Sequence, residues 1–246
     1  LAQSDSSKDK LVSKADKSGT NPINFTNDLR AYYEYQDLTG GGEGHVGTLE
    51  GRTPIFDGKV QVRVRVPFKA VDFDVGGMNI SESGLGDINA RLLNVPYLDP
   101  KNGLALAVGL EMFFPTARDD VLGEGKFSLG PQIFGVKFAP FGIKGSLIAP
   151  AVQQVFSVAG EDDRTDVNKT QIDVFILKQS DDKRKYVLLD PQYIIDWENE
   201  TEFGLMEAEA GYVFESGISF YGRPGIGFGG DKPIDYNIEV GIKYIF

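Results

Sequence analysis

Cysteine is absent from this chain of 246 residues, and histidine and tryptophan occur once each. The lack of cysteine excludes a disulfide framework and thiolate metal sites. No segment approaches the run of about eighteen apolar residues that a transmembrane helix needs. Basic residues are outnumbered, and the net charge of −11 argues against nucleic acid as a partner. The length is enough for one large domain.

The chain is rich instead in glycine and aromatic residues, with 30 Gly, 17 Phe and 10 Tyr. Its mean hydropathy of −0.20 is that of a soluble protein on average. A barrel that crosses a membrane with strands has this average too, because half of the residues in each strand face water. The composition therefore favours a strand-rich chain with aromatic girdles.

The last segment, residues 234–246, carries the clearest pattern. Its apolar side is formed by Ile234, Tyr236, Ile238, Val240, Ile242, Tyr244 and Phe246, and its polar side by Asp235, Asn237, Glu239, Gly241 and Lys243. Alternation with a period of two indicates a strand, and this one is long enough to cross a bilayer at a tilt. A terminal Phe also resembles the last strand of bacterial outer-membrane barrels. An edge strand of a soluble all-β protein is the alternative.

Eleven further segments alternate in the same way and are separated by turn residues. The sequence therefore predicts an all-β fold, a closed antiparallel transmembrane β-barrel of about 12 strands with both termini in the periplasm. Residues 69–83 are predicted to be a polar loop. In the first segment Phe25 is assigned to the lipid-facing side, and near Leu92 and Leu93 a change of face predicts a bulge. The eleven segments are 22–36, 45–55, 59–68, 84–97, 103–115, 126–138, 143–158, 169–179, 184–197, 201–214 and 217–228.

The first 21 residues differ in composition and are dominated by Ser, Asp and Lys. We predict a flexible polar N-terminal tail over residues 1–21 and a barrel over residues 22–246. A plug inside the lumen is the alternative for the tail. The chain opens Leu-Ala-Gln, which indicates a processed or recombinant mature form.

The polar sides of the predicted strands carry an uneven set of charges. Basic residues come mainly from the early strands and acidic residues from the late ones, which would stand on opposite walls of a closed barrel. Such walls would set up a transverse field across a pore. The alternative is that the side chains pair and fill a narrow lumen. The predicted pore-lining residues are Arg30, Arg52, Arg63, Arg65, Arg91, Glu111, Asp173, Asp190, Glu207, Glu209, Arg223 and Glu239, and Asp196 and Lys243 are assigned to the same face.

A barrel enzyme is the rival class. Outer-membrane hydrolases use histidine-assisted nucleophiles or Asp/His pairs, but no Ser or Asp near His45 forms such a motif. Glu207 and Glu209 could act as an acid–base pair, although two residues on one strand face more often line a lumen. The acidic loop 161–166 lacks the ligand spacing of a calcium loop. We predict no enzymatic activity, no metal site and no cofactor.

Two prolines suggest a weak point in the wall. Pro131 and Pro150 lie within neighbouring predicted strands, and proline cannot donate a hydrogen bond to the ladder. Local loss of pairing there would open a side window through which an apolar solute could reach the bilayer. An ordinary bulge, filled by water or a side chain, is the alternative.

Three short motifs carry a family resemblance. Residues 83–88, Ser-Gly-Leu-Gly-Asp-Ile, are followed by Gly-Leu-Ala-Leu at 103–106 and by Pro115-Thr116, and Pro54-Ile55-Phe56 is similar in character. Together they resemble the outer-membrane channels associated with the meta-pathway of phenol degradation, most clearly over residues 83–135. The resemblance implies a monomeric channel in the bacterial outer membrane for small hydrophobic or aromatic compounds.

The expected partners are membrane lipid, lipopolysaccharide and a small-molecule solute. A structural or adhesive barrel that acts through its extracellular loops is the alternative function, and a barrel enzyme is the less favoured one.

Overall fold

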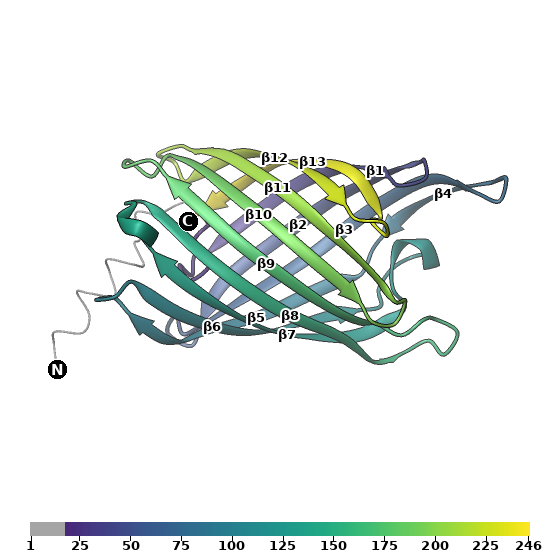
Figure 1. Cartoon of the computed structure of the whole chain (residues 1–246), viewed down its shortest axis with the longest axis horizontal. Helices are drawn as coiled ribbons and strands as arrows, with labels where there is room; N and C mark the ends of the chain where they lie inside the picture. The colour runs from purple at the N-terminus through teal and green to yellow at the C-terminus, as the bar shows by residue number, and fades with distance from the viewer. Residues whose placement is uncertain (1–17) are drawn as a thin grey trace.

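The computed structural model describes residues 18–246, which form a single closed antiparallel β-barrel (Figure 1). The sheet has thirteen strands, but β4 and β5 pair with successive parts of the same neighbour, β3. These two strands share one position, so the wall is twelve strands around. The all-β prediction of a 12-stranded barrel is confirmed. The strands are β1 (Asp28–Leu38), β2 (Glu43–Ile55), β3 (Val60–Val75), β4 (Met78–Leu85), β5 (Ile88–Asp99), β6 (Leu104–Phe114), β7 (Lys126–Phe138), β8 (Ser146–Gly160), β9 (Asn168–Gln179), β10 (Lys185–Asp196), β11 (Thr201–Val213), β12 (Ile218–Phe228) and β13 (Ile234–Ile245).

The first and last strands close the barrel. β1 pairs with β13 in a register that places Asp28 opposite Ile245, and on its other edge β1 pairs with β2. The N–H of Phe246 donates to the carbonyl of Asn27 at 3.1 Å. Among the described strands, every one except β4 is paired on both edges, and β4 pairs with β3 alone. A strand structure in hydrocarbon requires such closure.

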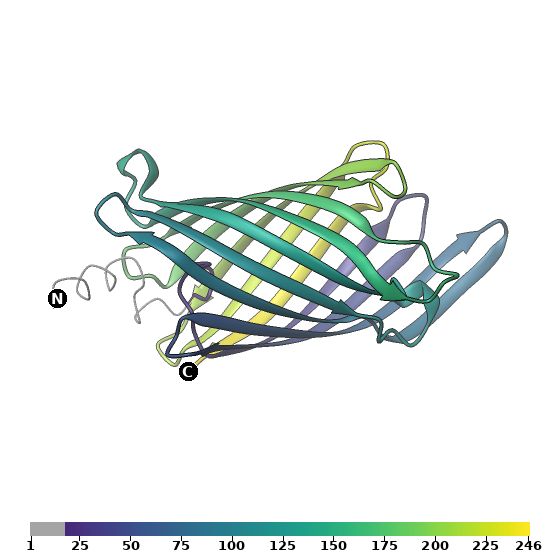
Figure 2. The ribbon, with the colours of Figure 1, turned by 90° about the horizontal axis from the view of Figure 1, so that it is seen from below.

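The two ends of the barrel differ (Figure 2). The end that holds the C-terminus has connections at 56–59, 100–103, 139–145, 180–184 and 214–217, one with the 3₁₀ turn η2 (Pro140–Gly142). The opposite end has the long connections 115–125, with η1 (Asp120–Leu122), and 161–167. Short turns mark the periplasmic end of outer-membrane barrels and longer loops the outer end.

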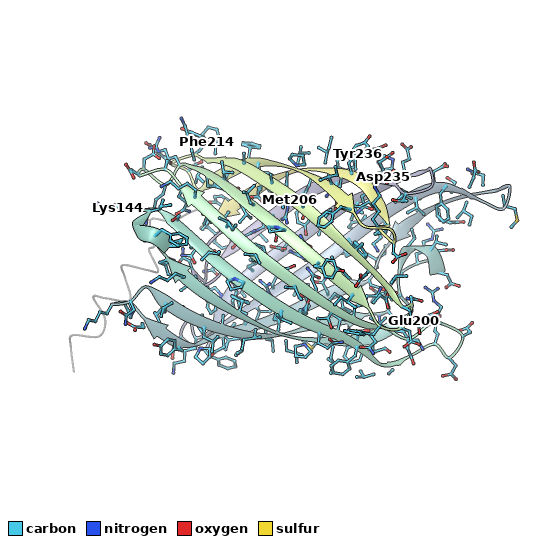
Figure 3. The ribbon with its side chains drawn as sticks, in the orientation of Figure 1. Lys144, Glu200, Met206, Phe214, Asp235 and Tyr236 are labelled. Atoms are coloured by element: carbon cyan, nitrogen blue, oxygen red, sulfur yellow. The ribbon has the colours of Figure 1, made fainter. Side chains whose placement is uncertain are left out.

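Side chains alternate between lipid and lumen along the strands. On β13, Ile238, Val240 and Tyr244 are exposed on the outside, whereas Asn237 and Lys243 are buried inside. Figure 3 shows Met206, Phe214 and Tyr236 on the outer surface. This apolar outer band is typical of a barrel that crosses a membrane with its strands, as predicted. None of the helices within residues 18–246 is long and apolar enough to cross a membrane.

Residues 69–83 correct the prediction of a polar loop. They form the outer half of β3 and most of β4, a hairpin with its tip at Gly76-Gly77 that projects beyond the rest of the barrel (Figure 1). Both strands of the hairpin are largely solvated. The prediction missed the alternating run Val71-Asp72-Phe73-Asp74 in the first of them.

The start of the barrel is a second correction. β1 begins at Asp28, and the preceding segment packs inside the barrel, so Phe25 contacts the buried apolar cluster instead of lipid. Of the predicted tail, Ser18 and Asn21 are buried, while residues 1–17 lie outside the described part of the chain. The bulge predicted near Leu93 occurs slightly later, as a register shift between Asn94 and Tyr97.

Candidate functional site

The barrel encloses a cavity of about 910 Å³. All of the residues predicted to line a pore also line this cavity. They are Arg30 on β1, Arg52 on β2, Arg63 and Arg65 on β3, Arg91 on β5, Glu111 on β6, Asp173 on β9, Asp190 on β10, Glu207 and Glu209 on β11, Arg223 on β12 and Glu239 on β13.

The periplasmic end of the cavity is narrowed by the inner segment, residues 18–25. The carbonyl of Gly19 accepts a hydrogen bond from Arg30 at 3.0 Å, and Ser18 accepts one from Gln179 at 2.8 Å. Ile23 belongs to an apolar cluster with Leu93 and Phe134. Burial of these apolar side chains holds the segment in place. The polar composition of the tail gives no sign of this packing.

The outer end is covered by the loop 115–125, whose Leu122 is fully buried against the cavity. Asp87, in the break between β4 and β5, holds the loop. Its carboxylate accepts hydrogen bonds from the N–H groups of Thr116 at 3.1 Å, Ala117 at 3.0 Å and Glu124 at 2.7 Å.

Glycine is needed where the loop meets Asp87. A Cβ at Gly123 would lie 2.6 and 2.7 Å from the two carboxylate oxygens, closer than contact allows. The Thr116 hydroxyl donates to the carbonyl of Gly86 at 3.1 Å and accepts from the N–H of Ile88 at 2.9 Å. The Gly-Leu-Gly-Asp and Pro-Thr motifs are therefore two halves of one anchor, a role that the sequence analysis missed.

One side of the cavity, here called the basic wall, carries five arginines and three carboxylates on β1, β2, β3, β5 and β6. The ladder register aligns Asp28, Arg52, Arg63, Arg91 and Glu111 across five neighbouring strands. Arg63 forms an ion pair with Glu111. Three arginines thus stand side by side, between one carboxylate at each end.

A second row of the basic wall is centred on Glu50. Its carboxylate contacts Arg30 at 3.3 Å, Arg52 at 2.5 Å and Arg65 at 2.5 Å. One buried glutamate therefore serves three arginines. The five arginines and the three carboxylates Asp28, Glu50 and Glu111 together have a formal surplus of two positive charges.

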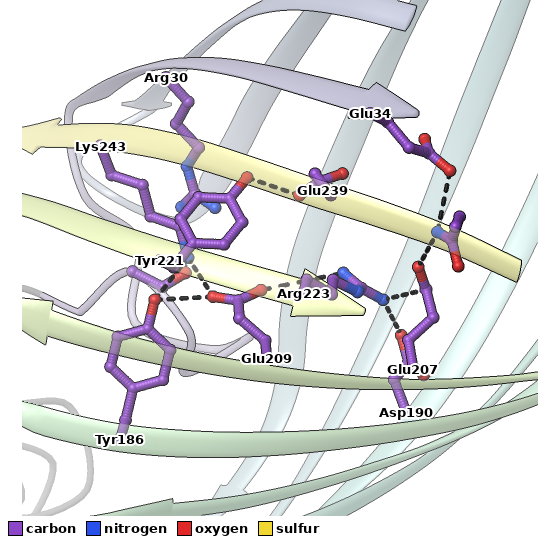
Figure 4. A network of polar contacts seen from close by, with 12 residues as sticks. Arg30, Glu34, Tyr186, Asp190, Glu207, Glu209, Tyr221, Arg223, Glu239 and Lys243 are labelled. Atoms are coloured by element: carbon purple, nitrogen blue, oxygen red, sulfur yellow. Dashed lines mark hydrogen bonds and ion pairs between the residues drawn. The ribbon is translucent and has the colours of Figure 1, made fainter. Parts of the chain in front are cut away.

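The other side, the acidic wall, holds six carboxylates and two cations. Arg223 is its centre and lies 2.5 Å from Asp190, 2.6 Å from Glu207 and 3.9 Å from Glu209 (Figure 4). The remaining carboxylates are Glu34, Asp173 and Glu239, so the wall has a formal surplus of four negative charges.

Lys243 is the second cation of the acidic wall. It forms an ion pair with Glu209 at 2.7 Å and lies 4.2 Å from the ring centroid of Tyr221. The hydroxyl of Tyr186 donates to Glu209 at 2.7 Å, and that of Tyr221 donates to Glu239 at 2.6 Å. Cation–π contact and hydroxyl donors thus supplement the ion pair.

Asp196 lies on the inward face of β10 like Asp190, but at the end of the strand and outside the set of residues that line the cavity. It ends β10 and accepts hydrogen bonds from the N–H groups of Glu198 and Asn199, each at 3.1 Å, so it caps the turn 197–200.

Outside the membrane, hydrogen bonds from Lys126 and Ser157 hold the pKa of Asp166 below its usual range and tie the loop 161–167 to β7.

Pro131 and Pro150 face outward from neighbouring strands, and the β7–β8 pairing is interrupted beside each. Paired residues stop at Leu129, resume from Gln132 to Phe134, and resume again at Lys137. At the first interruption the Gln153 amide donates to the carbonyl of Gly130 and to Glu111, both at 3.3 Å.

His45, the only histidine, lies on β2 with its Nδ1 2.6 Å from the hydroxyl of Tyr33. Neither a serine nor an aspartate contacts it among residues 18–246, so the described chain contains no histidine-based triad. Within the same residues no group of His, Asp and Glu side chains has the arrangement of a metal site.

No family model and no curated relative matches this sequence. Among solved structures, the fold is similar to an outer-membrane channel from Pseudomonas putida F1, with a TM-score of 0.73 and 12% identity over 90% of this chain and 96% of that chain. It is also similar to the KdgM porin, with a TM-score of 0.59 and 10% identity over 89% of this chain and 99% of that chain. The translocator domain of the autotransporter NalP from Neisseria meningitidis follows, with a TM-score of 0.54 and 11% identity over 97% and 95% of the two chains.

At these identities the likeness establishes the fold, a barrel of the bacterial outer-membrane type. It does not extend to the phenol-degradation family, so that resemblance stays a prediction.

Proposed function

We propose that this chain is a passive channel through which small solutes diffuse across the outer membrane, and not an enzyme. The observation that carries the proposal is the cavity inside the barrel, lined by two walls of opposite charge. Between the walls, β6 to β9 contribute apolar side chains such as Phe113, Phe134 and Phe175. A lining of this mixed kind suits hydrophobic or aromatic compounds with a polar group, which is the solute class that the sequence resemblance also suggests.

Conductance in planar bilayers tests the channel. Gln132→Trp places a large side chain in the cavity, whereas Ile133→Trp places the same side chain on the lipid side of the same strand. We expect single-channel current in the parent protein, a clear reduction in Gln132→Trp and no change in Ile133→Trp. A folded barrel that carries no current, or equal currents in both variants, would support a structural or adhesive role instead.

As part of the same function, we propose that an apolar solute leaves through the wall beside Pro131 and Pro150. The interruptions in the β7–β8 pairing support this exit, because fewer backbone hydrogen bonds hold the strands there. An ordinary bulge filled by Gln153 predicts a permanently sealed wall.

A disulfide staple separates these alternatives, since the chain has no cysteine of its own. Ile133→Cys with Val152→Cys joins β7 to β8 between the two interruptions, and Leu92→Cys with Leu110→Cys joins β5 to β6 as the matched control. Cellular uptake of a labelled aromatic hydrocarbon is expected to fall with the first pair only, relative to the single-cysteine variants. Equal uptake by both stapled proteins rules out the side exit.

A further inference from the structure

The row of arginines on the basic wall has too few partners. Arg52, Arg63 and Arg91 are directly opposed on β2, β3 and β5. Like charges in such positions destabilise a sheet. Arg52 is compensated by Glu50 and Arg63 by Glu111. Arg91 is also directly opposed to Glu111 on β6, but Glu111 pairs with Arg63. Arg91 itself makes neither an ion pair nor a hydrogen bond with any residue in the range 18–246.

Asn89, a neutral residue on the same face of β5, does not bond to Arg91, and its Oδ1 is also without a partner among the described residues. The Nε atoms of Arg63 and Arg91 are both shut off from solvent and without a hydrogen-bond partner. The side chains of Arg63 and Arg91 both line the cavity. A guanidinium in this position is costly unless water or an anion in the cavity completes its hydrogen bonds. Within the described chain Arg91 therefore lacks a hydrogen-bond acceptor, and a negatively charged acceptor would also offset the positive charge of the arginine row.

We propose that Arg91, with Arg63 beside it, binds the carboxylate of a small amphipathic organic acid inside the lumen. A guanidinium presents its donors in a planar fork that matches the two oxygens of a carboxylate. The ligand would supply the negative charge that the row lacks.

The residues around the row identify the rest of the ligand. Phe113 lines the cavity and lies diagonally across from Arg91 on β6. Phe134 on β7 adds further apolar surface to the cavity. An aromatic or aliphatic body gains from contact with these side chains, whereas inorganic phosphate or chloride does not.

The acidic wall defines how such a ligand lies. Its surplus carboxylates, including Asp173 and Glu239, repel an anion from β9 and β13. The carboxylate is thereby directed to the arginine row and the apolar body to β6 and β7. The inference rests on the proposed channel only for the route by which the acid reaches the site, and it names the solute class.

Calorimetric titration of the full chain in a non-ionic detergent tests the site, with benzoate and its neutral analogue benzamide as probes. Arg91→Gln is expected to weaken benzoate binding roughly tenfold or more, because a charge-assisted hydrogen bond is lost. Benzamide affinity should not change. Arg91→Lys, which keeps the charge and loses the fork, is expected to restore part of the loss.

Two controls keep the result interpretable. Arg118→Gln makes the same substitution at an exposed position outside the cavity and should leave benzoate affinity unchanged. Thermal unfolding should show Arg91→Gln to be as stable as the parent, because the substitution removes a like-charge contact.

The inference is overturned if benzoate binds Arg91→Gln within twofold of the parent, if benzamide loses affinity equally, or if inorganic phosphate competes as well as benzoate does. The conductance experiment is independent of this titration. A conducting barrel that fails to bind benzoate ends the inference and leaves the channel. A barrel that binds benzoate through Arg91 but does not conduct supports the binding site and contradicts the proposed channel.

Discussion

The basic and acidic walls are built from the same alternating strands but balance their charge by different means. On the acidic wall, carboxylates without a cation accept hydrogen bonds from neutral donors: Glu239 from Tyr221, and Asp173 from Gln171 at 2.9 Å. On the basic wall, Arg91 has no such neutral partner within residues 18–246. Tyrosine and amide side chains can satisfy a surplus carboxylate, but a surplus guanidinium needs acceptors. The acidic wall therefore offsets its surplus charge with neutral donors, although Asp190 Oδ1, Arg223 Nε and Asn237 Oδ1 are without a partner in the described part of the chain. On the basic wall, Arg91 has no such compensation from the described residues.

The strongest test of this difference removes the centre of the acidic wall. Arg223→Met leaves Asp190 and Glu207 without their cation and should destabilise the barrel by about 3 kcal/mol. Arg91→Met removes a cation that no carboxylate contacts, so its effect should be near zero. Urea unfolding of both variants in the same detergent measures the comparison. Equal losses of stability would mean that the two walls are compensated alike.

The second test addresses the outer end of the cavity. Asp87→Asn keeps the shape of the side chain but replaces a charged acceptor of three backbone N–H groups, which should cost about 2 kcal/mol locally. Faster hydrogen exchange confined to the loop 115–125 is expected. Asp119→Asn, at the other aspartate that accepts from this loop, is the matched control and should have a smaller effect. Exchange that rises across both walls would show that Asp87 supports the barrel and not the loop.

A third test measures the field between the walls. Arg63→Gln together with Arg65→Gln removes two positive charges and leaves Glu111 without its partner. The cation-to-anion permeability ratio should rise several-fold, because pore-lining charge governs ion selectivity. Reversal potentials in a salt gradient give the ratio. An unchanged value would indicate that these arginines are filling and do not act on permeating ions.

The smallest expected effect comes from the opposite wall. Asp173→Asn with Glu239→Gln removes two carboxylates that no cation contacts, so selectivity should shift about twofold towards anions. Stability should change little, since the amides still accept hydrogen bonds from Gln171 and Tyr221. A shift towards cations in the same reversal-potential measurement would contradict the arrangement of opposed walls.

Most of the barrel could be predicted from period-two alternation. The outward Val64 and inward Arg63 on β3 follow directly from it, because lipid and water face opposite sides of one strand. The prediction failed at two places outside that environment. The hairpin of β3 and β4 lies beyond the membrane, and Phe25 continues the pattern by chance although its segment turns into the lumen.

For the candidate site, the sequence could predict only which side of each strand faces the lumen. The sequence placed Arg91 and Glu111 towards the lumen, and both line the cavity. It could not show that Glu50 contacts three arginines, because that depends on the register between strands. The bonds from Asp87 to a loop some thirty residues later were equally inaccessible, since loop conformation has no periodicity to read.

The seam between β1 and β13 also has a kinetic meaning. Its pairs join the first strand to the last, so the closing ladder brings together residues separated by almost the whole barrel. Contacts of such long range form late, because the chain entropy of a large loop is lost before they are made. The inner segment immediately precedes β1 and packs against residues from both halves of the barrel, including Leu93 and Tyr186. Pairing of β1 with β13 and packing of the inner segment in the lumen therefore occur at the same late stage of folding.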